Sequence, residues 1–397
     1  MSWYLMLALI AVALVVLIGP AFTAEGDGTA VAGATEDAAG RIVGSVDGSL
    51  SAAEPESEGF TVSVSGDILI HRRVAEAAQT DDGWDFVQLL SPVRNLIESR
   101  DFAICHLEVP LSGTNQDLAF GESADGGAFR SPNQLADAIS EVGFDSCSVA
   151  SNHAYDSGES SVLNTTEQLD RADVPHVGIA ATSEEARSLW QFDVKGTTVG
   201  HLSYTYGLNG REPGSVPTEQ VAQIDEATIL ADAARQRAAG SDFVIVSMHW
   251  GNEFQTELND QQNDLGARLL ASTDVDLVVG HHAHVPQRIE EIDGEYIAYG
   301  LGNLLSNQSS SAPECPNVCP LESQDGMFVD FVVDRRTDGT LGVVEVRTNP
   351  TWVDVGGTWK VIDTQAPPVV GVDIDTAVLD ASAERTWSTT GIGRPRA

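Results

Sequence analysis

Short apolar runs alternate with longer amphipathic stretches along the chain from Phe60 onward. The runs are rich in β-branched and aromatic residues, which is typical of buried strands. They predict strands at 60–65, 102–107, 144–150, 176–179, 198–204, 243–248 and 275–279. The stretches between them predict helices at 85–98, 132–142, 159–172, 220–238 and 261–272. Strands that alternate with helices of this length indicate an α/β fold.

Three further strand-like runs, at 296–299, 327–333 and 341–346, follow one another without long helices between them. Strands joined by short connections pair antiparallel. We therefore predict two stacked mixed sheets flanked by helices, in one domain that covers residues 59–350 and contains a Cys-bearing loop at 310–326. Residues 351–397 are predicted to be a C-terminal extension whose last thirty or so residues are irregular.

The amino-terminal segment 1–24 carries no charge from residue 3 onward. A run of roughly 20 apolar residues is long enough to span a bilayer as a helix. It is either a membrane anchor or a signal peptide, and the lack of a basic start and of a good small-residue cleavage site favours the anchor. Residues 25–58 lack apolar periodicity and predict a flexible acidic linker. We expect an extracytoplasmic domain on a single anchor in the cell membrane, with a secreted protein as the alternative.

The net charge of the chain limits which partners it can bind. The 397 residues include 59 acidic and 21 basic side chains, for a formal net charge of −38, and the lysines are Lys195 and Lys360. An acidic surface poor in lysine predicts adaptation to salt, as in a halophilic protein. A field this negative repels nucleic acid, so we expect no nucleic-acid partner, and any polyanion would need a local cationic centre such as a metal.

The four cysteines of an exported chain can form disulfides. Cys315 and Cys319 are the better pair, because the Pro-bounded loop between them can turn back on itself. Metal binding by this pair is the alternative, although a zinc ribbon would need a second such pair. Cys105 and Cys147 lie in apolar strand-like runs, where they are either buried thiols or a second disulfide.

Histidines gather at the ends of the predicted strands. The motifs are GDILIH (66–71), HLEVP (106–110), SNHAYDSG (151–158), HWGNEF (249–254) and GHHAHVPQ (280–287). One edge of a sheet could collect them all. His282 and His284 alternate onto one face, and neutral imidazoles are preferred ligands for zinc, manganese and iron. The cluster therefore indicates a metal site, against the alternative of a solvated polar loop.

Two carboxylates and an amide extend this site. Asp67 and Glu108 end strands and can project into it, although a turn or an exposed strand end is the alternative for each. Asn152 can coordinate a cation through its amide oxygen, while His153 faces the substrate as proton donor and Asp156 orients it. A helix-capping Asn beside a surface His is the alternative there.

Three further residues are candidates. His249 ends the strand at 243–248 as an imidazole at the mouth of the site, and Glu253 is within reach as a base or as a plain loop acid. His71 is either an additional ligand or an ordinary surface histidine. His106 points to the same strand face as Glu108 and could lie behind the ligands.

The motifs SNHAYDSG, HWGNEF, GHHAHVPQ and YGLGN (299–303), in this order, resemble the CapA family of poly-gamma-glutamate capsule synthesis proteins, whose domain looks like a calcineurin-type metallophosphoesterase. The resemblance covers roughly residues 60–305. It implies a four-layer α/β/β/α sandwich of metallophosphatase type with a two-metal centre at the sheet edge. The ligands that it implies are Asp67, Glu108, Asn152, His249, His282 and His284.

The resemblance also assigns roles and shows two departures. Glu108 stands where phosphoesterases usually have a bridging Asp, and His153 matches their proton donor. Leu69 stands where phosphoesterases have a ligand His, so His71 is only a candidate substitute. His106 stands where family members often have Asn.

Two divalent cations (Mn, Zn or Fe) at roughly 3.5–4 Å from each other could hold a bridging hydroxide and stabilise charge on the attacked group. The residues suit hydrolysis of a phosphoester best, and the family name adds an anionic polymer as a substrate. The alternative is a non-hydrolytic, membrane-anchored polymer assembly or export component, with membrane-embedded capsule synthesis subunits as partners. A third reading is metal-assisted proton abstraction from a peptide, with Glu253 or His153 as base.

Overall fold

The computed structural model describes residues 59–121, 127–212, 214–312, 315, 318–366 and 368–393. The predicted anchor at 1–24 and the predicted linker at 25–58 lie outside these ranges. Within them, no helix combines the length and apolar character needed to cross a membrane.

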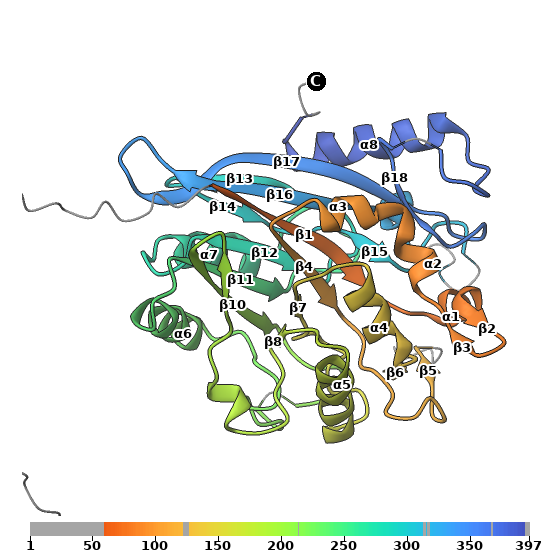
Figure 1. Ribbon diagram of the computed structural model, residues 1–397, viewed down its shortest axis with the longest axis horizontal. Helices are drawn as coiled ribbons and strands as arrows, with labels where there is room; N and C mark the ends of the chain where they lie inside the picture. The colour runs from red at the N-terminus through yellow and green to blue at the C-terminus, as the bar shows by residue number, and fades with distance from the viewer. Residues whose placement is uncertain are drawn as a thin grey trace, which may run out of the picture. The chain divides into compact units, whose positions relative to one another are not determined.

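Two mixed sheets form the centre of the fold (Figure 1). The first has the order β18-β17-β16-β1-β4-β7-β8, with β15 beside β1. Its strands are β1 (Phe60–Ile68), β4 (Phe102–Leu107), β7 (Ser146–Ser148), β8 (His176–Val177), β15 (Asn303–Leu305), β16 (Asp325–Arg335), β17 (Leu341–Val353) and β18 (Val361–Asp363). Strand β1 pairs parallel with β4 and antiparallel with β16, so the sheet is mixed.

The second sheet has the order β13-β14-β12-β11-β10-β9. Its strands are β9 (Gln191–Val194), β10 (Thr197–Thr205), β11 (Phe243–His249), β12 (Leu277–His281), β13 (Ile289–Ile292) and β14 (Glu295–Ala298). Strands β10, β11 and β12 run parallel, which brings their carboxyl ends to one edge. Two short hairpins lie outside both sheets: β2 (Gln79–Thr80) with β3 (Gly83–Trp84), and β5 (Ala119–Phe120) with β6 (Phe129–Arg130).

Apolar side chains separate four layers. One core joins the facing sides of the two sheets, for example Val62 and Ile104 from the first with Ile245 and Val279 from the second. The outer face of the first sheet is covered by α1 (Arg72–Ala78), α2 (Val87–Leu90), α3 (Arg94–Glu98), α4 (Gln134–Glu141) and α5 (Glu159–Arg171). The outer face of the second is covered by α6 (Glu226–Ala238) and α7 (Asp260–Leu270). The predicted α/β/β/α sandwich of two mixed sheets is confirmed.

Three local predictions need correction. The helix predicted at 85–98 is divided into α2, a 3₁₀ turn at Ser91–Val93 and α3, with Pro92 in the first turn of the 3₁₀ segment. The helix predicted at 220–238 begins only at α6, where the Asp225 side chain accepts a hydrogen bond from the Thr228 amide. The tail predicted to be irregular contains α8 (Thr376–Thr390), which packs along β17 (Figure 1).

Both cysteine pairs form disulfides. Cys315 is bonded to Cys319, as predicted, and Cys105 is bonded to Cys147, which resolves the alternative that the sequence left open. The second bond joins the adjacent parallel strands β4 and β7.

Candidate metal centre

The carboxyl ends of the parallel strands bring the histidine motifs together. Asp67 is the penultimate residue of β1, and Glu108 directly follows β4. From the second sheet, His249 ends β11, and His282 and His284 follow β12. In α/β sheets the carboxyl ends of parallel strands are where ligands bind. Asn152, in the loop after β7, reaches the same edge, and its amide oxygen lies 2.8 Å from His249 Nε2.

Four overlapping groups of acids and histidines lie at this edge among the described residues, and two of them consist entirely of predicted ligands. Glu108, His249 and His282 form one, and Asp67, Glu108 and His284 form the other, with the ligand atoms of each group within 4.8 Å of one another. All five side chains are buried. The structure thus gathers six of the seven predicted ligands, counting Asn152, and Glu108 is shared between the two groups. That these residues bind metal remains a prediction.

Glu108 is the most unusual of these side chains. Both of its carboxylate oxygens are buried and have no hydrogen-bond partner among the described residues. The nearest imidazole nitrogens are His284 Nε2, 3.6 Å from Oε1, and His249 Nε2, 3.9 Å from the same atom. Burial raises the pKa of Glu108 to about 7, although His284 opposes the rise. A buried carboxylate without donors is costly unless a cation satisfies it, so this position fits a metal ion.

Asp67, unlike Glu108, has hydrogen-bond donors around its carboxylate. Its carboxylate accepts hydrogen bonds from the His282 amide at 3.0 Å and from His281 Nδ1 at 2.9 Å, and His284 Nδ1 lies 3.3 Å away. Burial alone would raise the pKa of Asp67, but the bonds from His281 and His284 hold it well below 3.8. Asp67 is therefore ionised and able to act as a ligand.

The backbone after β12 has an unusual conformation at two of the predicted ligands. His282 has φ of 84° and His284 has φ of 55°, in the left-handed region that non-glycine residues rarely occupy. Backbone strain of this kind persists where the surrounding structure enforces it, often at functional sites. Burial lowers the pKa of His282 to about 3, so its ring is neutral and carries a free lone pair.

His153 and Asp156 form the predicted pair at the rim. His153 Nδ1 lies 2.9 Å from Asp156 Oδ2, and the Phe129 amide donates to the same oxygen at 2.7 Å. Burial lowers the pKa of His153, but the hydrogen bond and charge of Asp156 outweigh burial and raise it above 6.5. Glu253, the third catalytic candidate, is exposed and groups with His282 and His284.

His71 lies near the site but is not a member of the ligand groups. It occupies the residue before α1, and its ring packs edge-on against Phe129 with 5.3 Å between ring centres. It belongs to none of the acid and histidine groups found in the described part of the chain. Burial lowers its pKa to about 3. His284 and His153 also lower the pKa of His71, so its ring lies near the site, and its role as a substitute ligand for Leu69 stays a prediction.

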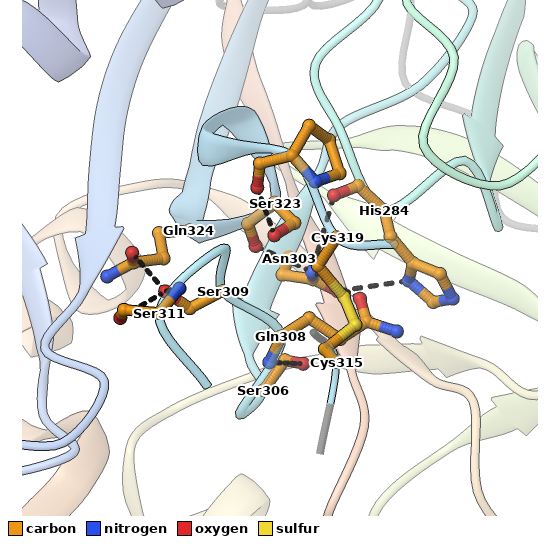
Figure 2. Close-up of a disulfide and its surroundings, with 11 residues drawn as sticks. His284, Asn303, Ser306, Gln308, Ser309, Ser311, Cys315, Cys319, Ser323 and Gln324 are labelled. Carbon is orange, nitrogen blue, oxygen red and sulfur yellow. Dashed lines mark hydrogen bonds between the residues drawn. A yellow bond between two sulfur atoms is a disulfide. The ribbon is translucent and has the colours of Figure 1, made fainter. Parts of the chain in front are cut away.

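Several residues of the site were not predicted from the sequence. Tyr206 lies over the His282 ring with 4.7 Å between ring centres, and the Asn209 amide donates to the Asn152 carbonyl at 2.9 Å. The Asn303 side chain lies 3.0 Å from His284 Nδ1 and donates to the Ser323 carbonyl at 2.9 Å, beside the Cys315–Cys319 disulfide (Figure 2). The signal that could have found Asn209 is its place in a Gly-flanked loop after a parallel strand.

The donor set suits a borderline divalent cation. Two carboxylates, one amide oxygen and three imidazoles are the ligands that zinc, manganese and iron accept. The orphaned carboxylate of Glu108 and the contact of His249 Nε2 with an amide oxygen both fit such an ion. The residues of the site therefore fit a divalent metal ion.

Two curated relatives of this chain are CapA proteins of capsule or PGA biosynthesis. Over 260 residues the chain is 26% identical to the capsule biosynthesis protein CapA of Bacillus anthracis, covering 64% of this chain and 61% of that protein. It is 24% identical over 256 residues to the PGA biosynthesis protein CapA of Bacillus subtilis (strain 168), covering 63% and 64%. The matches thus span less than two thirds of either relative.

A solved structure and a family model complete the comparison. The calcineurin-like phosphoesterase YfkN from Bacillus subtilis superimposes with a TM-score of 0.44 at 14% identity, covering 83% of this chain and 98% of that one. The model of the bacterial capsule synthesis protein PGA_cap matches residues 61–308. Because this match covers more than half of the 397 residues, the chain belongs to the bacterial capsule synthesis protein PGA_cap family.

Proposed function

We propose that this capsule synthesis protein is a hydrolase of phosphoester type with two divalent cations at the sheet edge. Asp67, Glu108 and His284 hold one cation in this proposal. Glu108, Asn152, His249 and His282 hold the other. The observation that carries the proposal is the buried carboxylate of Glu108, which has no donor and belongs to both ligand groups.

Bound there, the cations would supply the positive charge that stabilises a phosphoryl group under attack. His153 performs the proton transfer. Its Nδ1–H donates to Asp156, which leaves Nε2 to carry the proton for the leaving oxygen. The hydrogen bond and charge of Asp156 raise the pKa of His153 against the effect of burial, which favours the protonated ring that can donate. The Phe129 amide fixes Asp156 and so keeps the His153 ring in one orientation.

The proposed substrate is an anionic polymer or a phosphoester. A protein with a net charge of −38 repels such molecules unless a local cationic centre offsets its field. The metal centre would be that local positive charge. Membrane-embedded capsule synthesis subunits are the proposed partners.

We further propose an extracytoplasmic location. Disulfides persist in oxidising compartments, and both described cysteine pairs form them. A membrane anchor in the first 24 residues and a salt-adapted acidic surface remain predictions from the sequence.

The test is hydrolysis of a chromogenic phosphodiester by the metal-loaded protein, with His153→Gln as the variant. Gln retains a polar side chain but donates no proton, so we expect turnover to fall by about 10²- to 10⁴-fold while metal content stays unchanged. Glu167→Gln, an exposed change on α5, is the matched control and should retain full activity. A metal-loaded protein that binds poly-glutamate but cleaves no phosphoester would favour the assembly component over the hydrolase.

A further inference from the structure

A buried chain of hydrogen-bonding groups runs behind His249, away from the substrate side. His249 Nδ1 lies 2.9 Å from His106 Nε2, and His106 Nδ1 lies 2.8 Å from Ser148 Oγ. Ser148 Oγ is also 3.3 Å from the Cys105 carbonyl, to which it can donate. The three side chains are buried, with exposures of 1% or less, so bulk water does not compete for these groups.

Two directions of donation satisfy this chain, because a neutral imidazole has one donor and one acceptor nitrogen. In the first, His249 Nε2–H donates to Asn152, His106 Nε2–H donates to His249, and the Ser148 hydroxyl donates to His106. In the second, His249 Nδ1–H donates to His106, His106 Nδ1–H donates to Ser148, and Ser148 donates to the Cys105 carbonyl. Going from the first direction to the second, His249 Nε2 releases a proton to solvent, His106 Nε2 passes its proton to His249 Nδ1, Ser148 passes its proton to His106 Nδ1, and Ser148 regains one proton from solvent. Each ring then keeps one N–H and the serine keeps its O–H, so the number of protons is equal in both directions.

Only the second direction frees His249 Nε2 to bind a cation. In the absence of a cation, that nitrogen faces the Asn152 amide oxygen at 2.8 Å, and two acceptors at this distance need a proton between them. A cation bound here would be held by His249 and Asn152 in place of that proton, which would pass to solvent. We propose that His106 is a positioning residue that changes tautomer together with His249 when a divalent cation binds, with Ser148 as the end of the chain. This inference rests on the proposed metal centre.

Strand pairing fixes the positions of the hydrogen-bonded side chains His106 and Ser148. Strands β4 and β7 pair His106 with Ser148 and, one position earlier, Cys105 with Cys147. Successive side chains of a strand point to opposite faces, so the disulfide lies in the core under the helices while His106 and Ser148 point between the sheets. The His281 ring stacks on His106 with 4.0 Å between ring centres. His106 is therefore confined on several sides, and the exchange needs no movement of its ring.

The direct test is nitrogen NMR of the whole chain with ¹⁵N-labelled histidine, recorded without metal and after zinc addition, with His106→Asn and His249→Asn used for assignment. We expect both rings as Nε2–H tautomers without metal and both as Nδ1–H tautomers with zinc. With cadmium-113 in place of zinc, His249 should show a nitrogen–cadmium coupling and His106 none. An unchanged His106 tautomer, or a cadmium coupling to His106, would overturn the inference.

Zinc affinity, measured by competition with a chelator, gives a second readout. His106→Leu removes the acceptor for His249 Nδ1–H and should weaken zinc binding by about 10- to 100-fold, as loss of such supporting groups usually does. His106→Asn keeps an acceptor oxygen and should restore most of the affinity. His201→Leu is the matched control, because His201 is equally buried between two serines, Ser146 and Ser247, but supports no proposed ligand.

These outcomes separate the two proposals. If the wild-type protein binds no zinc, the metal centre itself is refuted. If it binds zinc and His106→Leu binds it equally well while remaining folded by circular dichroism, the positioning role of His106 is refuted and the metal centre stands.

Discussion

Replacing Glu108 by Gln should stabilise the metal-free protein while weakening its metal binding. Burial, opposed by the attraction of His284, raises the pKa of Glu108 from 4.5 to about 7 in the metal-free fold. Ionised Glu108 therefore destabilises the folded state, and this cost grows as pH rises from 4.5 to 7. At about 1.4 kcal/mol for each pH unit, the cost reaches about 3 kcal/mol above pH 7. Gln is neutral at every pH and lacks this cost.

The assay is denaturant unfolding of Glu108→Gln and the wild-type protein, after chelation, at pH 5 and pH 8. We expect the variant to be more stable by about 3 kcal/mol at pH 8 and by much less at pH 5. Saturating zinc should reverse the order, because a ligand bound to the folded state alone adds about 4 kcal/mol at a thousandfold excess over its Kd. Glu253→Gln is the matched control. Its carboxylate is exposed, so metal-free stability should change by less than about 0.5 kcal/mol.

Two results would refute this reasoning. If metal-free Glu108→Gln is less stable than wild type at pH 8, the favourable interactions of the ionised carboxylate, such as that with His284, outweigh the cost of its burial. If the stability difference is the same at pH 5 and pH 8, it does not arise from ionisation of Glu108.

Three further predictions concern the scaffold. Burial lowers the pKa of His201 to about 3, so this ring stays neutral in the folded state, and the folded state loses stability as pH falls below 6.5. Between pH 7 and pH 5 the free energy of unfolding of the wild type should fall by about 2 kcal/mol more than that of His201→Leu. Equal losses in the two proteins would contradict this. Cys105 and Cys147 are 42 positions apart. Replacing both by Ala should lower the free energy of unfolding in urea by about 4 kcal/mol. A loss under about 1 kcal/mol would contradict the cross-link. Arg385→Met leaves the buried Asp325 carboxylate without its cation and should cost about 3 kcal/mol, most of which Asp325→Asn in the same chain should restore, whereas no recovery would argue against the ion pair.

The positions of the predicted ligands could be inferred from the sequence because each ligand motif lies at the end of a predicted strand. Parallel strands end at one edge, and the motifs at Asp67, Glu108 and His249 each follow an apolar run, so their convergence follows from topology. His71 was harder, because spacing from Asp67 does not reveal that α1 begins at the next residue. That helix start places His71 against Phe129, whose ring also packs on His153.

Contacts between sheets could not be predicted from the chain. The alternation of β4 places His106 on the face of Glu108, but its partner His249 belongs to the other sheet, 143 positions away. Helix α8 was missed for a related reason. Its Thr- and Ser-rich sequence has little helical preference, and it is held by tertiary contacts such as that of Arg385 with Asp325.

The central claim is tested most directly by counting the metal bound to the whole chain. Protein purified in high salt would be reconstituted with zinc, manganese or iron and measured by elemental analysis, with His282→Ala measured alongside. The account predicts about two ions per chain in the wild type and a loss of bound metal in His282→Ala. No bound metal after reconstitution of folded wild-type protein would contradict it.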